Sequence, residues 1–391
     1  MLVIDVVLVA ILLVALLIGV QRGLLASLGV LIGLVLGGFA AYWLVPIVND
    51  LWPWQGSRVI VVIGVSVALV LGGAAAGGAI GGALRRGVDR STPLRVVDRV
   101  LGGAIAVLGG ALSFALIGSS IAATGAPGVS TMVASSQVLR TIDSLTPRPV
   151  AEALARVRSV VLDEGLPQLG VLLDLDVQPT APPVALDDPE LAVAAASVAR
   201  VSGVAYACGT SATGSGFVLA PDRVVTNAHV VAGVTAPLVE LPGRPAREGR
   251  IVYFDPVDDL ALIAVDDLGA DAIPVVAPIA PGTAAVVQGY PYGGPFTMTG
   301  AEVISSGSVL VPDITGTSSA LRDIYALAAQ VQPGNSGGPL LTADGDVAGV
   351  VFARAESDAD RGYAMTTTEL EPVLAGAAGW TQAVSTGSCT G

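Results

Sequence analysis

Past the midpoint of the chain the sequence reads Thr226-Asn227-Ala228-His229-Val230-Val231. His229 is the only histidine among the 391 residues. An ordinary imidazole gains and loses its proton near neutral pH, so His229 is the side chain best suited to act as a base there. A base of this kind needs a hydroxyl to activate and a carboxylate to orient it, and both types of residue follow His229 in the sequence.

Ser336 lies in a glycine-rich segment, and Asp259 directly precedes the apolar run at residues 260–265. The segment reads Gln332-Pro333-Gly334-Asn335-Ser336-Gly337-Gly338-Pro339-Leu340. We predict that Ser336 is a nucleophile and that His229 takes its proton and returns it to a leaving amine. The N–H groups of Gly334 and Ser336 would form the oxyanion hole.

Three carboxylates are candidates for orienting His229, namely Asp255, Asp258 and Asp259. We favour Asp259 because the apolar strand that follows it would hold it rigidly. Asp255 and Asp258 remain rivals.

These motifs resemble the chymotrypsin superfamily and, within it, the trypsin-like HtrA proteases. The resemblance is carried by residues 214–218, 226–231, 259–262 and 332–340. It implies an all-β, chymotrypsin-like double β-barrel at residues 191–391 and a serine endopeptidase that acts through an acyl-enzyme. Only 55 residues follow Ser336, so we expect no PDZ domain after the second barrel.

The pattern of residues 195–391 is that of short strands between Gly and Pro turns, which is typical of barrels and sandwiches. We predict strands at residues 216–219, 223–226, 260–265, 284–288, 349–352 and 362–365.

The first 124 residues are strongly apolar. Hydrophobic residues make up 53% of the whole chain and charged residues only 13%, which favours membrane spans. Four apolar runs, at residues 2–20, 24–48, 59–84 and 100–124, are long enough to cross a bilayer. We therefore predict an α-helical membrane domain of four spans at residues 1–124. The first run lacks a positive n-region and a cleavage site, so we take it as a span and not a signal peptide.

The arginines predict the orientation of these spans. Five of them follow the third span, at positions 85, 86, 90, 95 and 99, whereas the loop after the second span has no basic residue before Arg58. The positive-inside rule then places both termini, and everything after residue 124, outside the cytoplasm. Residues 124–391 hold 28 acidic residues against 12 arginines, which argues against nucleic-acid binding.

Glycines recur every four residues in the second and third spans, at Gly29, Gly33 and Gly37 and at Gly73, Gly77 and Gly81. Such stripes predict close helix packing, within the chain or by self-association. We find no ionisable residue in the middle of a span, which favours an anchor embedded in membrane lipids over a transporter.

The four-span half resembles the CvpA-like colicin V production family. The layout of the whole chain resembles the MarP-like membrane-anchored periplasmic serine proteases of mycobacteria. That resemblance implies an inner-membrane protein whose protease domain faces the periplasm and cleaves proteins or peptides there, cell-wall hydrolases among them. It also implies a role in acid and oxidative stress resistance and in maintenance of the cell envelope.

Residues 125–190 are interpreted as a connector between the two domains. Helical periodicity is present at residues 129–145 and 150–166, and a proline-rich spacer follows at residues 178–183.

Two positions near Ser336 bear on activation and specificity. Asn335 stands where digestive serine proteases carry Asp, and a neutral amide cannot form the ion pair with a new N-terminus that activates those zymogens. Gln330 occupies the position of the pocket floor by resemblance, so a preference for Arg or Lys is not expected.

Cys208 and Cys389 both fall in the part of the chain predicted to be exported, where disulfides persist. We favour a bridge between them over two free thiols, and the MarP-like resemblance points the same way. On the chain-entropy model a loop of this length is worth about 5 kcal/mol.

Two other functions are compatible with the pattern, namely a catalytically silent protease fold that binds or senses, and a channel or transporter with an accessory domain. The predicted chemistry uses no cofactor and no metal. An unperturbed histidine has a pKa of about 6.5, so we expect activity to fall at acid pH with a single group, His229.

Overall fold

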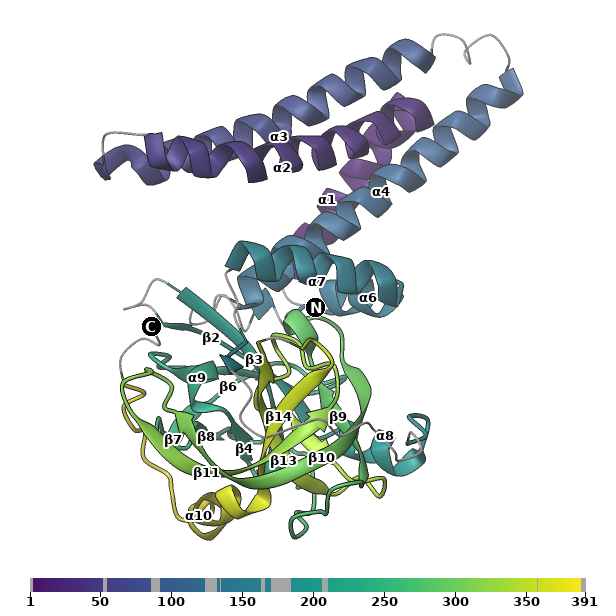
Figure 1. The fold of residues 1–391 in the computed structure, drawn as a ribbon. Helices are drawn as coiled ribbons and strands as arrows, with labels where there is room; N and C mark the ends of the chain where they lie inside the picture. The colour runs from purple at the N-terminus through teal and green to yellow at the C-terminus, as the bar shows by residue number, and fades with distance from the viewer. Residues whose placement is uncertain are drawn as a thin grey trace. The chain divides into compact units, whose positions relative to one another are not determined.

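The structure is a computed structural model, and it describes residues 3–51, 55–85, 92–123, 132–133, 135–162, 166–169, 184–205, 210–356 and 358–387. Contacts between residues divide the chain into two units, Met1–Ala115 and Leu116–Gly391. The first unit is helical and the second consists mainly of β-strands (Figure 1).

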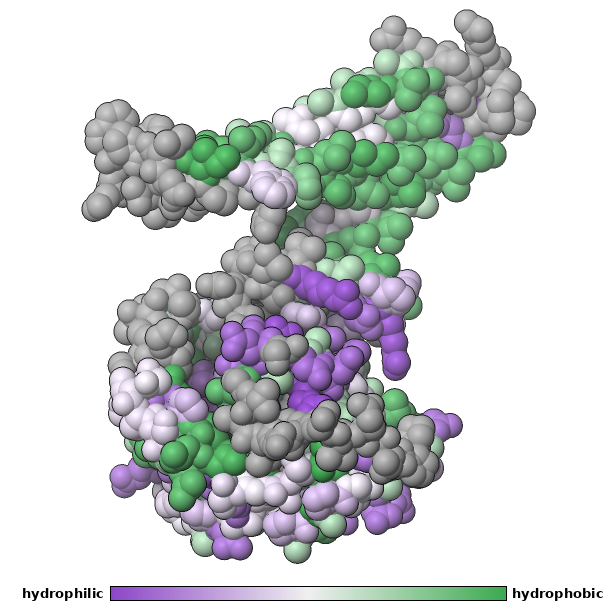
Figure 2. Space-filling view, in the orientation of Figure 1, coloured by the Kyte–Doolittle hydropathy of each residue, from purple (hydrophilic) through white to green (hydrophobic). Residues whose placement is uncertain are grey.

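The first unit consists of long apolar helices. They are α1 (Val3–Arg22), α2 (Leu24–Leu51), α3 (Gln55–Arg85) and the larger part of α4 (Thr92–Ala123). Hydrophobic residues cover much of their outer surface (Figure 2). Among the described residues, three stretches are long and apolar enough to cross a membrane, namely Val3–Arg22, Leu24–Ala41 and Arg95–Ala115. The apolar stretch in α3, Ala68–Leu84, is shorter, so the count of four spans stays a prediction.

The two glycine stripes pack against each other within this chain. A Cβ added at Gly33 would collide with the carbonyl oxygen of Gly73, and one at Gly29 with that of Gly77. Only glycine therefore allows α2 and α3 to lie this close. Of the two uses predicted for the stripes, the structure shows packing inside the chain; self-association stays untested.

The junction between α1 and α2 is closed by α4. Gly23 has a positive φ of 79° and separates the two helices. The Asp98 carboxylate accepts a hydrogen bond of 3.0 Å from the backbone N–H of Leu24, and Asp98 is 5% exposed. This carboxylate satisfies an N–H at the start of α2 that has no partner within the helix.

The second unit contains two seven-stranded sheets. The first has the order β6-β5-β2-β3-β4-β8-β7. Its strands are β2 (Val198–Ala205), β3 (Thr210–Ala220), β4 (Arg223–Thr226), β5 (Leu238–Glu240), β6 (Arg247–Glu248), β7 (Arg250–Asp255) and β8 (Leu260–Ala264).

The second sheet has the order β1-β13-β12-β9-β10-β11-β14, and β13 also pairs with β14. Its strands are β1 (Gln168–Leu169), β9 (Ala284–Gly289), β10 (Thr297–Pro312), β11 (Ser319–Ala328), β12 (Pro339–Leu341), β13 (Val347–Ala355) and β14 (Arg361–Thr366). The extra pairing closes β9 to β14 into a ring. In the first sheet the described outer strands β6 and β7 are not paired with each other, so a second closed barrel stays a prediction.

One hydrophobic core joins the two sheets. It includes Phe217 and Leu262 from the first sheet and Val286, Phe352 and Tyr363 from the second, all at most 2% exposed. The site described below lies on loops that this shared core holds in place.

The remaining described elements are short, except for two helices of the connector. They are α6 (Gln137–Leu145), α7 (Arg148–Leu162), α8 (Pro189–Ala195), α9 (Ala228–Val231), η2 (Pro291–Gly293), η3 (Thr367–Leu370) and α10 (Glu371–Gly376). Helix α6 begins eight residues later than the periodicity predicted, at the N-cap Ser136, whose hydroxyl accepts from the N–H of Leu139. The strand β1, which pairs in parallel with β13, was not predicted.

Candidate active site

His229 and Asp259 meet because β4 and β8 are neighbours. Thr226, at the end of β4, pairs with Ala261, near the start of β8. Asp259 therefore lies beside the short helix α9 that carries His229. The His229 Nδ1 lies 2.8 Å from Asp259 Oδ2 and 3.0 Å from Oδ1, and the backbone N–H of His229 donates to Oδ1 at 2.9 Å. The carboxylate thus fixes both the ring and the backbone of the histidine.

Asp259 is held in an uncommon backbone conformation. Its φ is 56°, a left-handed value that aspartate tolerates better than most residues. Its carbonyl oxygen accepts a hydrogen bond of 2.9 Å from the Asn227 amide, and Asp259 is 3% exposed.

The rival carboxylates have other contacts. Asp255 accepts hydrogen bonds from the backbone N–H groups of Val257 and Asp258, at 2.8 and 3.1 Å, and so closes the turn after β7. Burial and the nearby Asp255 raise the pKa of Asp258, which lies close to the cation Arg322. Neither carboxylate is hydrogen-bonded to His229.

Ser336 follows a tight turn formed by the glycine-rich segment. The N–H of Asn335 donates to the Gln332 carbonyl at 3.0 Å, with Pro333 and Gly334 at the corner. Gly334 has a φ of +92°, which suits the third position of a type II turn. The N–H groups of Gly334 and Ser336 donate no hydrogen bond within the described part of the chain, so both are available to an oxyanion.

The structure does not bring the histidine and the serine into hydrogen-bond contact. The His229 Nε2 is buried and has no hydrogen-bond partner among the described residues. Ser336 is 3% exposed, and its carbonyl accepts from the Ser215 N–H at 2.7 Å. Hydrogen bonds between base and nucleophile are often long without substrate and tighten when it binds.

Ser215 is a site residue to which the sequence assigned no role. Its hydroxyl donates to the carbonyl of Gly334 at 2.7 Å and accepts from the N–H of Tyr290 at 2.9 Å. The Thr226 hydroxyl donates in turn to the carbonyl of Ser215 at 2.7 Å. Ser215 therefore ties β3 of the first sheet to the turn before Ser336. Its place in Gly214-Ser215-Gly216 was visible in the sequence, but its partners 75 and 119 residues away were not.

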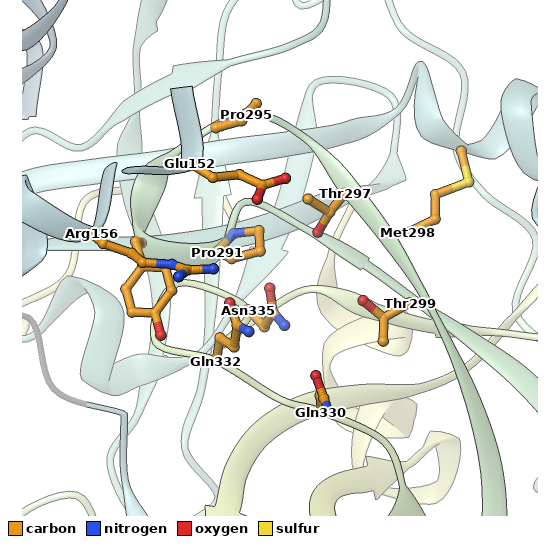
Figure 3. A pocket seen from close by; sticks show the side chains of 11 residues that line it. Glu152, Arg156, Pro291, Pro295, Thr297, Met298, Thr299, Gln330, Gln332 and Asn335 are labelled. Carbon is orange, nitrogen blue, oxygen red and sulfur yellow. The ribbon is translucent and has the colours of Figure 1, made fainter. Parts of the chain in front are cut away.

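Gln330 and Asn335 both line a cavity of about 220 Å³. Gln330 is exposed, and its side-chain amide donates to Asp360 at 2.7 Å. Asn335 is 2% exposed, and its Oδ1 has no hydrogen-bond partner within the described residues. Figure 3 shows both side chains in this cavity. Cys208 and Cys389 lie outside the described residues, so their pairing stays a prediction.

Two family models match the chain. Residues 214–350 match a trypsin-like peptidase domain, and residues 4–147 match the colicin V production protein family. The two matches are separate in the sequence; the first falls within the predicted protease domain, and the second covers the predicted membrane domain and continues to residue 147, within the segment interpreted as the connector.

Several relatives are named as serine proteases. The chain is 34% identical to "Serine protease Rv3671c" of Mycobacterium tuberculosis over 312 residues, which is 78% of each chain. It is also 40% identical to "Putative serine protease HhoB" of a Synechocystis strain over 148 residues, or 35% of this chain and 33% of that protein. Among solved structures, the active form of the Rv3671c protease is 38% identical, with a TM-score of 0.52 over 57% of this chain and all of that one.

Proposed function

Because the chain belongs to the family of the Mycobacterium tuberculosis serine protease Rv3671c and is a serine endopeptidase, we propose that Ser336, His229 and Asp259 form its catalytic triad. The observation that carries this assignment is the pair of contacts between His229 Nδ1 and the Asp259 carboxylate, 2.8 and 3.0 Å long. A carboxylate at Nδ1 holds the tautomer whose free Nε2 accepts a proton.

In the proposed reaction the Ser336 Oγ attacks the carbonyl carbon of a peptide bond and gives its proton to the His229 Nε2. The oxygen of that carbonyl becomes an oxyanion, which the N–H groups of Gly334 and Ser336 stabilise. The protonated His229 then gives the proton to the leaving amine, and the acyl group remains on Ser336. A water molecule then gives a proton to His229 and attacks the acyl carbon. His229 returns the proton to the Ser336 Oγ, and the acid product leaves.

We place this protease domain outside the cytoplasm, on a membrane anchor. The apolar helices of residues 3–115, the match to the colicin V production family and the arginine distribution support that location. Proteins or peptides of the periplasm would be its substrates, including cell-wall hydrolases, and resistance to acid and oxidative stress its role. A Ser336→Ala variant in the native envelope should bind its substrates without cleaving them, and the proteins that are recovered with it would identify these substrates. If no envelope protein were among them, the proposed substrate class would be wrong.

The Cys208–Cys389 disulfide is part of the proposal. The tail before Cys389 is docked on the first sheet, because the Val384 N–H donates to the Ile251 carbonyl of β7 at 2.9 Å. Further along the tail, the Thr386 hydroxyl donates to the Val234 carbonyl at 3.0 Å. Val234 in turn packs on Gly203, in β2, five residues before Cys208. The intact mass without reductant should be lower by two hydrogen atoms than the mass after reduction; equal masses would exclude the bridge.

The triad is tested with a fluorophosphonate probe on the full-length protein in detergent. We expect the wild type to be labelled and Ser336→Ala not to be. Asp259→Asn should slow labelling by about 10⁴-fold, because the amide favours the wrong histidine tautomer. Asp258→Asn removes a charge one position earlier and should stay within about tenfold of wild type. A wild-type protein that is never labelled would instead favour a silent protease fold.

A further inference from the structure

Helix α7 of the connector packs against the turn η2, next to the segment that holds Gly334 and Ser336. Ala155 of α7 is 6% exposed, and a Cβ added at Gly294 would lie 2.6 Å from the Ala155 Cβ. Glu152 and Arg156, on either side of Ala155 along α7, border the same cavity as Asn335 (Figure 3). A helix from the connector is therefore in direct contact with a loop of the protease domain.

The turn η2 has a conformation that its neighbours must maintain. Tyr292 has φ 56° and ψ 25°, a left-handed conformation that is costly for an aromatic residue. On one side of η2, the Arg200 guanidinium donates to the Gly293 carbonyl at 2.9 Å and is itself held by Glu240 at 2.8 Å. The next residue, Gly294, is in contact with Ala155 of α7.

This turn also determines the direction of the Gly334 N–H. The N–H of Tyr292 donates to the carbonyl of Pro333 at 2.5 Å. A trans peptide points its C=O and its N–H in opposite directions, so the bond to Pro333 fixes where the N–H of Gly334 points. If Tyr292 relaxed to a right-handed conformation, this bond would be lost and the peptide between Pro333 and Gly334 could rotate.

We propose that α7 is an intramolecular positioning element for the oxyanion hole, with Ala155 as its positioning residue. By packing on Gly294 it holds η2 in place, and so raises the fraction of molecules in which the Gly334 N–H faces the oxyanion. Activity scales with that fraction, since only the competent conformation reacts. The inference rests on the proposed function, because it assigns Gly334 to the oxyanion hole.

The test compares Ala155→Phe with Ala153→Phe in the full-length protein in detergent micelles. Ala153 is exposed on the same helix, so the same substitution there leaves the contact with Gly294 intact. With a fluorophosphonate probe we expect the maximal labelling rate of Ala155→Phe to fall at least about tenfold, toward the loss of about 10²–10³-fold that follows removal of one oxyanion donor. Ala153→Phe should stay within about twofold of wild type. Probe affinity should change little, and Ala155→Ser should keep the wild-type rate.

If Ala155→Phe fails to fold, a second pair of variants tests the positioning role of α7. Gly294→Ala places a methyl against Ala155 and should slow labelling, and Ala155→Gly in the same chain should restore part of the rate. Equal rates for wild type and Ala155→Phe, or no rescue of Gly294→Ala, would overturn the role of α7 and leave the proposed function intact. A wild type that does not label would overturn the proposed function itself.

Discussion

Replacing Ser215 should disturb the oxyanion hole while leaving the three proposed triad residues in place. Its buried hydroxyl satisfies the Gly334 carbonyl and the Tyr290 N–H, and alanine would leave both without a partner. We expect Ser215→Ala to lower the free energy of unfolding by about 1–3 kcal/mol. The labelling rate of Ser336 should also fall, since the turn at Gly334 loses a fixed point. Ser211→Ala, at a half-buried position of the same strand, is the control; equal effects of the two changes would contradict this role.

At this scale the sequence pointed to the residues proposed for the chemistry better than to those proposed to position them. His229 and Ser336 lie in short patterns, so a few consecutive residues identify each one. Tyr292 and Ala155 matter only through partners far away in the chain, Pro333 and Gly294, and no local pattern marks such pairs. The choice of Asp259 was possible because an apolar strand directly follows it, whereas the pairing of that strand with β4, which brings Asp259 to His229, is a long-range contact that only the structure shows.

Among the elements, α2 and α3 depend on glycine at the positions where their backbones touch. Gly33→Ala would place a methyl group on the Gly73 carbonyl, and the two helices would have to separate. Over-packing of this kind costs about 1–3 kcal/mol. Gly38→Ala, five residues along the same helix, meets nothing within 4 Å and is the matched control. We expect thermal unfolding in detergent at a lower temperature for Gly33→Ala only. Equal midpoints for the two variants would show that this contact does not stabilise the protein.

The predicted strands were located well because alternating apolar residues between turns give a local signal. Strand β4 (Arg223–Thr226) matches its predicted range, and the range 349–352 lies within β13 (Val347–Ala355). The two-residue strand β1 was missed, since its pairing with β13 depends on a long-range contact and not on its own sequence. Helix α6 begins after its N-cap Ser136, and the two described residues 132–133, within the predicted range 129–145, are also helical.

For the whole molecule, we consider how the free energy of unfolding depends on pH, since residues 124–391 are rich in carboxyl groups. Two half-buried carboxyls face the buried cation Arg322, which is 2% exposed. Burial, helped by Asp255, raises the pKa of Asp258 in spite of Arg322. Burial also raises the pKa of Glu369, with Asp258 and Asp323 adding to it, while a hydrogen bond from the Asp323 N–H and the charge of Arg322 act against it.

These raised pKa values determine the sign of the pH dependence. A carboxyl whose pKa is higher in the folded state takes up its proton there first, so the free energy of unfolding rises as the pH falls through that value and levels off below the unfolded value of about 4. We expect Asp258→Asn with Glu369→Gln to unfold at a higher temperature than wild type at about pH 7, and to gain less stability between about pH 7 and about pH 4. Thermal unfolding of the full-length protein at both pH values measures this, with Asp344→Asn, at an exposed turn, as the control. A double variant that is less stable than wild type at neutral pH, or that keeps the wild-type change with pH, would show that these carboxyls are stabilised in their charged form by Arg322.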